Sequence, residues 1–197
     1  AESIALPNPP EQIACGTAHV AVLTEGTKAK TILVFDAAGK QVDQMDFEST
    51  TLLDFGFADT AEETLWTLEL DDTASIPVST LKTYNMSTMR TTGVMTMQGA
   101  LIQKVIFTAK SIFVSCTDSL VRYNAVGNTE AYRLSVYGWQ LGDRSSSGGS
   151  PLLLYMKNGV ESAATAGSVR LYQVQEGDVA SAAISTVSEN VTASGRE

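Results

Sequence analysis

The residues with the greatest potential for chemistry stand near the start of the chain. His19 is the only histidine, and Cys15 precedes it by four residues. If both lay on one extended strand they would be about 13 Å apart, too far for a Cys–His pair. The sequence also has no G-x-S-x-G motif, so it does not indicate a serine nucleophile of the hydrolase type. We therefore expect His19 to be a partly buried structural residue and predict no catalytic residue.

Carboxylates at two successive turns form the second group. Asp71 and Asp72 stand at one turn, and Asp59, Glu62 and Glu63 stand at the turn before it. Carboxylate oxygens suit Ca²⁺, so Asp59, Glu62, Asp71 and Asp72 are weak calcium candidates. The D-x-D-x-D-G spacing of a calcium loop is absent, and one histidine with two remote cysteines cannot supply a usual zinc ligand set. We predict no metal site beyond these weak candidates.

A Gly/Ser-rich segment at 142–150 is the third group. Its composition is typical of a surface loop, and such loops often carry binding residues. The candidate contacts are Asp143, Arg144, Ser146 and Gly148. Neither of the glycine-rich phosphate-binding motifs is present, so we predict no nucleotide or other cofactor.

The charge distribution excludes one class of partner. The net charge is −9, and residues 1–100 hold 14 acidic against 5 basic side chains, whereas residues 101–197 hold 8 of each. Between Gln41 and Leu81 there are ten acids and no lysine or arginine. Such a surface repels phosphate backbones, so we exclude nucleic acid as a partner; the protein or small molecule that binds is unknown.

The ends of the chain and the two cysteines bear on its location. The chain begins at Ala1 rather than methionine. From this we expect that an N-terminal piece has been removed and that the protein is extracytoplasmic, either secreted or anchored to a membrane through that piece. Residues 1–11, with three of the five prolines, are expected to be an extended leader. Cys15 and Cys116 would form a disulfide in an exported protein or be buried thiols otherwise. The longest apolar runs are far below the ~20 residues that span a bilayer.

The hydrophobic pattern predicts an all-β chain. Short β-branched and apolar runs alternate with turn residues, and apolar residues do not recur at helical spacing. Residues 37–40 are expected to form a hairpin turn in which Gly39 adopts a positive φ. After Val42 the alternation slips by one residue, which predicts a bulge or a strand end there.

An aromatic residue followed by a short polar one recurs along the chain. The aromatic residues of the pairs are 49, 39 and 49 residues apart, a period typical of propeller blades with four strands each. Because the aromatic–polar pair occurs four times along the chain, we interpret it as a scaffold feature rather than a functional site. The pairs are Phe35-Asp36, Tyr84-Asn85, Tyr123-Asn124 and Tyr172-Gln173. We predict one domain at 12–186 with units at about 12–47, 50–98, 100–136 and 137–186, followed by a tail at 187–197.

The repeats resemble those of a known class of propellers. Leu52–Asn85, with the run LWTLELDD, is similar to a blade of the YVTN-type and quinoprotein-like, or WD40-like, β-propellers. Ser111–Asn124 and Ile32–Val42 resemble the same pattern. The resemblance implies a β-propeller-like array of about four four-stranded antiparallel blades. Quinone-binding members carry a tryptophan after the GK turn, where this chain has Asp43, so the resemblance implies no quinone.

The number of units leaves the closure of the ring open. Four blades can form a closed ring or an incomplete propeller, and an incomplete one exposes apolar faces that favour self-association. The first hypothesis for function is a non-enzymatic interaction or ligand-binding domain of an exported or envelope-associated protein. The alternatives are a carboxylate-dependent hydrolase or lyase with its site at the propeller axis, and a structural fragment of a larger propeller assembly.

Overall fold

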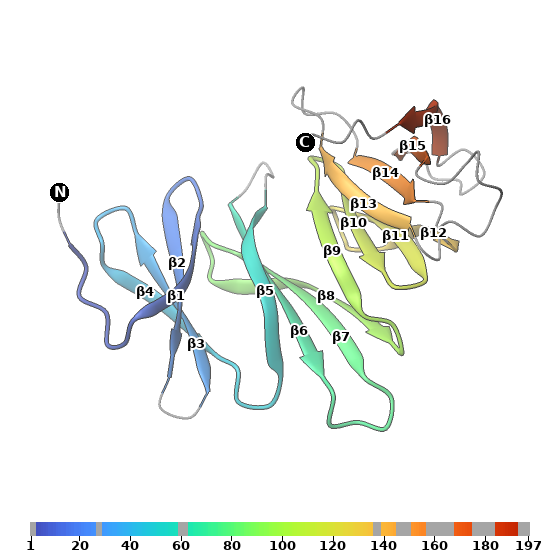
Figure 1. Ribbon diagram of the computed structural model, residues 1–197. Coiled ribbons are helices and arrows are strands. Elements are labelled where there is room, and N and C mark those ends of the chain that lie inside the picture. The colour runs from blue at the N-terminus through green and yellow to red at the C-terminus, as the bar shows by residue number, and fades with distance from the viewer. Residues whose placement is uncertain are drawn as a thin grey trace. The chain divides into compact units, whose positions relative to one another are not determined.

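The chain is built from β-strands throughout its described parts. The computed structural model describes residues 3–26, 29–58 and 63–135 with their side chains, and the backbone of the four strands beyond them (Figure 1). Every regular element among these residues is a strand, which confirms the all-β prediction. No helix in the described ranges is long and apolar enough to cross a membrane.

In the described part of the chain, sixteen strands form four separate sheets, each a meander of four consecutive antiparallel strands. The first sheet has β1 (Pro10–Cys15), β2 (His19–Glu25), β3 (Lys30–Asp36) and β4 (Gln41–Asp46), and the second has β5 (Thr51–Ala58), β6 (Thr64–Asp71), β7 (Val78–Asn85) and β8 (Arg90–Gln98). The third has β9 (Ile102–Phe107), β10 (Ser111–Cys116), β11 (Ser119–Asn124) and β12 (Glu130–Ser135). The fourth has β13 (Trp139–Arg144), β14 (Pro151–Met156), β15 (Ser168–Val174) and β16 (Ile184–Thr192).

The sheets group into two compact units, Ala1–Leu101 and Ile102–Glu197. The first unit contains the first two sheets, and the second contains the other two. Two strands extend across predicted boundaries. β1 begins at Pro10, within the expected leader, and β16 extends to Thr192, within the expected tail. The division into one domain with a leader and a tail remains a prediction.

A shared apolar core joins the two sheets of the first unit. Successive side chains of a strand point to opposite faces, so every second residue of β2 and β3 faces the second sheet. Burial of each leucine, isoleucine, valine, phenylalanine or methionine side chain in this core contributes about 1.5–3 kcal/mol. The buried residues of this core are Ala21, Leu23, Ile32, Val34, Phe47, Phe55, Leu65 and Met86.

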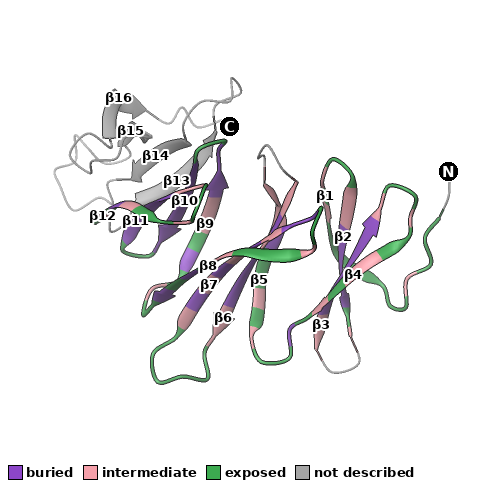
Figure 2. Cartoon of the chain, turned by 180° about the vertical axis from the view of Figure 1, so that it is seen from behind, coloured by how far each residue is buried: buried purple, intermediate pink, exposed green. Residues whose placement is uncertain are grey.

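The leader covers the opposite face of the first sheet. Val22, Leu33 and Phe35 form a smaller buried cluster there, and Leu6 packs against it together with Val20. Both faces of β2 and β3 are therefore apolar, and their middle residues are buried without a break (Figure 2). This explains why these two strands have a continuous apolar run instead of an alternating one.

In the second unit, the third sheet has a buried centre. All six residues of β10 are buried, and so are the first five residues of β11. Arg122 lies in this centre at 4% exposure, where its Nε donates to Ser111 Oγ over 2.8 Å. Its guanidinium carbon lies 5.9 Å from the centroid of the Tyr132 ring, a cation–π contact. Arg122 is thus held by its own sheet.

Local features of the first sheet agree with the sequence. Gly39 has φ of +78° in the turn between β3 and β4, and the register of that pair jumps from Val34–Asp43 to Phe35–Gln41. The extra residue is Val42. The predicted hairpin turn and bulge are both confirmed.

Candidate functional site

His19 forms a hydrogen bond with a carboxylate just before a strand of the neighbouring sheet. Its Nδ1 lies 2.6 Å from Glu63 Oε2, and the side chains are only 16% and 13% exposed. Glu63 Oε1 also accepts from the backbone N–H groups of Ala18, at 2.8 Å, and of His19, at 3.2 Å. Because His19 begins β2 and Glu63 immediately precedes β6, the contact ties the first sheet to the second. His19 is partly buried, as expected.

The electrostatics of Glu63 suit this structural role. Burial raises the pKa of its carboxyl, but the hydrogen bonds from the His19 side chain and from the two backbone N–H groups outweigh burial, and the charge of His19 adds to them. The net result is a pKa below the ordinary value of 4.5. A carboxylate that three hydrogen-bond donors keep charged holds those donors in place and is not a proton donor at neutral pH. We call this set of contacts, Glu63 with His19 and with the N–H groups of Ala18 and His19, the clamp.

Cys15 and His19 lie on two different strands. A hairpin turn separates them, in which Gly16 N donates to the carbonyl of His19 over 2.8 Å, and Cys15 pairs in register with Val20. The single-strand geometry considered from the sequence is therefore wrong. Both cysteines are free; Cys116 is buried, but Cys15 is exposed, so the expectation of a buried thiol is wrong for Cys15.

The carboxylate of Glu69 in β6 is buried, which we did not predict from the sequence. Glu69 is 2% exposed and accepts hydrogen bonds from the hydroxyls of Thr50 and Thr67, each at 3.0 Å. The ammonium of Lys82 lies 2.8 Å from Glu69 Oε2 and is itself one-third exposed. The signal that could have revealed Glu69 is its place on the same strand face as Leu65 and Thr67, which a solvated acid would avoid.

The metal candidates fall into two groups. Asp71 accepts from the hydroxyl and the N–H of Thr73, at 2.7 and 3.0 Å, and these hydrogen bonds lower its pKa. Asp72 is exposed. Asp59 and Glu62 lie outside the described residues, and within the described part of the chain no cluster of His, Cys, Asp or Glu could hold a metal ion. Calcium binding remains a weak prediction.

The expected binding loop is described only at its start. Asp143 and Arg144 lie in the strand β13 rather than in a loop, and the register of β13 with β14 shifts between Leu141 and Arg144. Ser146 and Gly148 lie outside the described residues. Binding at these four residues remains a prediction.

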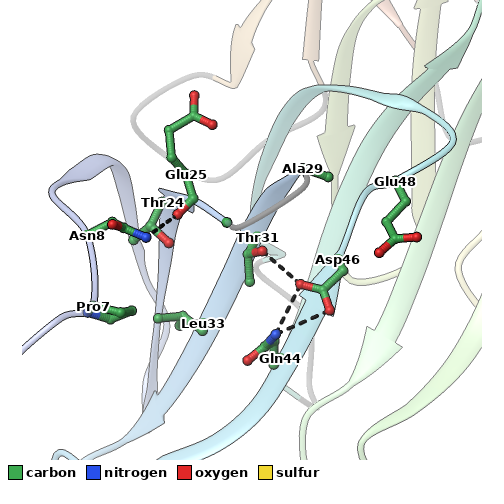
Figure 3. A pocket seen from close by; sticks show the side chains of 11 residues that line it. Pro7, Asn8, Thr24, Glu25, Ala29, Thr31, Leu33, Gln44, Asp46 and Glu48 are labelled. Carbon is green, nitrogen blue, oxygen red and sulfur yellow. Dashed lines mark hydrogen bonds between the residues drawn. The ribbon is translucent and has the colours of Figure 1, made fainter.

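A hollow of about 370 Å³ lies beside the first sheet, between the leader and the ends of β2, β3 and β4 (Figure 3). The leader contributes Pro7 and Asn8, and the Asn8 amide donates to the carbonyl of Glu25 over 2.6 Å. Asp46 accepts from the hydroxyl of Thr31 at 2.7 Å. This volume falls within the usual range for small-ligand sites. The acidic stretch is visible in the sequence, but the position of the leader beside it arises only in the folded chain.

Comparison with known proteins identifies the architecture. No protein-family model matches the chain, and no curated protein matches it in sequence. Among solved structures, a crystal structure of the eukaryotic initiation factor superposes with a TM-score of 0.55 at 20% identity, over 86% of this chain and 42% of the other. Kluyvelomyces marxianus Hsv2 aligns with a TM-score of 0.47 at 10% identity, over 80% of this chain and 43% of the other.

The first three sheets have the fold of WD40-like propeller blades. The identities are low enough that the match concerns the fold alone, and the chain spans less than half the length of the solved proteins it matches. This confirms the resemblance inferred from the repeats.

The repeated aromatic–polar pair ends the third strand of each of the first three blades. Asp36 Oδ1 accepts from the N–H groups of Ala38 and Lys40, and Asn85 Oδ1 accepts from the N–H of Thr88. In the third blade, the Asn124 amide donates to the Thr129 hydroxyl. The polar residue thus forms hydrogen bonds with backbone or side-chain groups of the turn that follows, and the pair is a scaffold feature.

Proposed function

We propose that this chain is a non-enzymatic interaction module made of WD40-like blades, which belong to a ring larger than four blades. The observation that carries the proposal is the match to a propeller chain of which these blades cover only 42%. Propellers of this architecture typically serve as scaffolds for protein interaction, and their blades need neighbours to cover both faces. Further blades would come from the same polypeptide or from a second copy. The exported or envelope-associated location expected from the sequence is part of this proposal.

The polar groups of the first unit support a scaffold role. The only histidine is engaged by Glu63, and the buried Glu69 is engaged by Lys82 and two hydroxyls. The His19–Glu63 contact ties two blades together, and the contacts of Glu69 lie within the second blade and the turn that leads into it. Large apolar side chains stand exposed on edge strands, where a further blade or partner would cover them. Ile13 on β1 is 57% exposed, and Val94 on β8 is 56% exposed.

Sedimentation velocity of edge-strand variants tests this proposal. Ile13→Asp and Val94→Asp should each shift the association of the chain toward monomer, because an unpaired charge enters the contact. Val126→Asp is the matched control, since Val126 is 89% exposed in the turn after β11. The control should associate like the wild type. Equal association of all four proteins would overturn the proposal that these edges form the contact.

A further inference from the structure

The hollow beside the first blade contains a buried hydroxyl that has no hydrogen-bond partner among the described residues. Thr24 is 1% exposed, and its side chain points into the hollow beside that of Asn8 (Figure 3). Among the described residues its hydroxyl has no hydrogen-bond partner. A buried polar group without a partner costs free energy, so a threonine at this position points to an occupant that binds its hydroxyl.

The charge of the hollow specifies the sign of that occupant. Glu25, Asp46 and Glu48 line it, and none of the described residues that line it is a lysine or an arginine. Lys30 interacts electrostatically with Glu25, and its ammonium forms an ion pair with Glu11. Asp46 and Glu48 have no cationic partner in the described part of the chain. Anions are repelled from this hollow, and cations are favoured.

Two neighbouring donors fix the position of one carboxylate. The Thr31 hydroxyl and the Gln44 amide, which lies 3.0 Å from Oδ1 and 3.2 Å from Oδ2, both donate to Asp46. Asp46 and Gln44 share one face of β4, whereas Met45 faces the core between the blades. The alternation of the strand therefore presents this carboxylate to the hollow in a held orientation.

The type of cation follows from the acceptors and the walls. The carboxylates do not gather into a group that could hold a metal ion within the described residues. An alkylammonium group carries three donors and no acceptor, which suits a site that offers the Thr24 hydroxyl and two carboxylates as acceptors. Leu33 and Pro7 supply apolar wall for an alkyl stem. A hollow of about 370 Å³ has room for a chain of four or five carbons with its ammonium head.

We propose that this hollow binds a primary alkylammonium group, presented either by a free amine or by a lysine side chain of a partner. Thr24, Asp46 and Glu48 would bind the head, and Leu33 and Pro7 would contact the stem. The site lies wholly within the first unit and does not depend on how the propeller ring is completed.

Titration of the full chain with two probes, followed by NMR shifts of backbone amides, tests this proposal. The probes are n-butylammonium and the capped peptide Ac-Gly-Lys-Gly-amide, with butan-1-ol as the neutral isostere. Binding of butylammonium supports a free-amine site, and binding of the peptide alone supports a lysine side chain. Butan-1-ol should not bind. The absence of binding by either cation would overturn the proposal, as would equal binding of the alcohol.

Variants separate a built site from general acidity. Asp46→Asn should weaken binding about tenfold, because the lost charged hydrogen bond is worth about a factor of ten. Asp43→Asn removes the same charge from the same strand outside the hollow and should bind like the wild type. Equal loss in both proteins would overturn the proposal.

Thr24→Val provides the decisive variant, because valine has the shape of threonine without the hydroxyl. It should weaken binding at least threefold while the chain stays as resistant to urea as the wild type, since the hydroxyl has no partner among the described residues. Unchanged binding in this variant would contradict the role of Thr24 and overturn the site as proposed.

Discussion

His19 Nδ1 and Glu63 Oε2 lie 2.6 Å apart across two blades, although the residues are 44 positions apart in the chain. The pair is mostly shielded from solvent, and the same carboxylate accepts two backbone N–H groups of the hairpin turn between β1 and β2. One side chain of the second blade thus orders a turn of the first. Contacts of this kind let neighbouring meanders stack in one relative orientation, which apolar packing alone specifies weakly.

Glu63→Gln should destabilise the first unit by about 1–3 kcal/mol, because an amide offers one acceptor oxygen where the carboxylate offers two, and loses the charge. Urea unfolding followed by tryptophan fluorescence measures the change, with Trp66 in β6 as the reporter. Glu48→Gln removes an exposed carboxylate and is the control, with an expected change within ~0.5 kcal/mol. Equal midpoints for the two variants would contradict the clamp.

The contribution of Glu63 should depend on pH in one direction. The folded-state pKa is depressed below 4.5, so its stabilisation is fully present above the ordinary pKa and is lost as the pH falls through the lowered value. We expect the difference in unfolding free energy between wild type and Glu63→Gln to shrink as the pH falls below 4.5. Unfolding curves at a series of pH values measure it. A difference that grows on acidification would show that the pKa is raised instead.

Gly16→Ala should act through the same clamp. A Cβ at this position would overlap Glu63 Oε1 and would stand 2.8 Å from Phe57 Cδ1, so the carboxylate must leave its place. The double variant with Glu63→Gln should therefore cost less than the sum of the two single variants. A double-mutant cycle measures the coupling. Additive costs, within ~0.5 kcal/mol, would mean that Gly16 acts independently of the clamp.

One leucine of the second blade lies in the core and another lies at the surface, so their substitutions can be compared. Leu65 is fully buried between the first two blades, and Leu65→Ala should cost about 2–5 kcal/mol through lost burial and the cavity left behind. Leu53, on the neighbouring strand β5, is 43% exposed, and Leu53→Ala should cost much less. Urea denaturation of both variants decides the matter, since similar costs would place Leu65 outside the interface between the blades.

The local features of the fold were accessible from the sequence. The hairpin turn with Gly39 and the bulge at Val42 follow from a two-residue period and its interruption, which neighbouring residues carry by themselves. The all-β class follows from the same period repeated along the chain. The aromatic–polar pairs marked the ends of third strands because the turn after each needs a side-chain acceptor or donor.

The polar sites were not accessible, because they depend on contacts between distant segments. Nothing local distinguishes Glu63 from its acidic neighbours, and its role appears only when the first hairpin is placed beside it. Thr24 reads as an ordinary strand residue until the leader covers it, and Asn8 reads as part of a surface segment until its amide meets Glu25. Burial of this kind is a tertiary property that a propensity or a motif does not encode.

The mass of the chain in solution tests the central claim most directly. Light scattering after gel filtration, over a wide range of loading concentrations, should give an apparent mass that rises above the 20.9 kDa of a single chain as the concentration increases. This result is expected if the blades belong to a larger ring and leave apolar edges open. A constant mass of 20.9 kDa at high concentration would contradict the account and favour a closed ring of four blades.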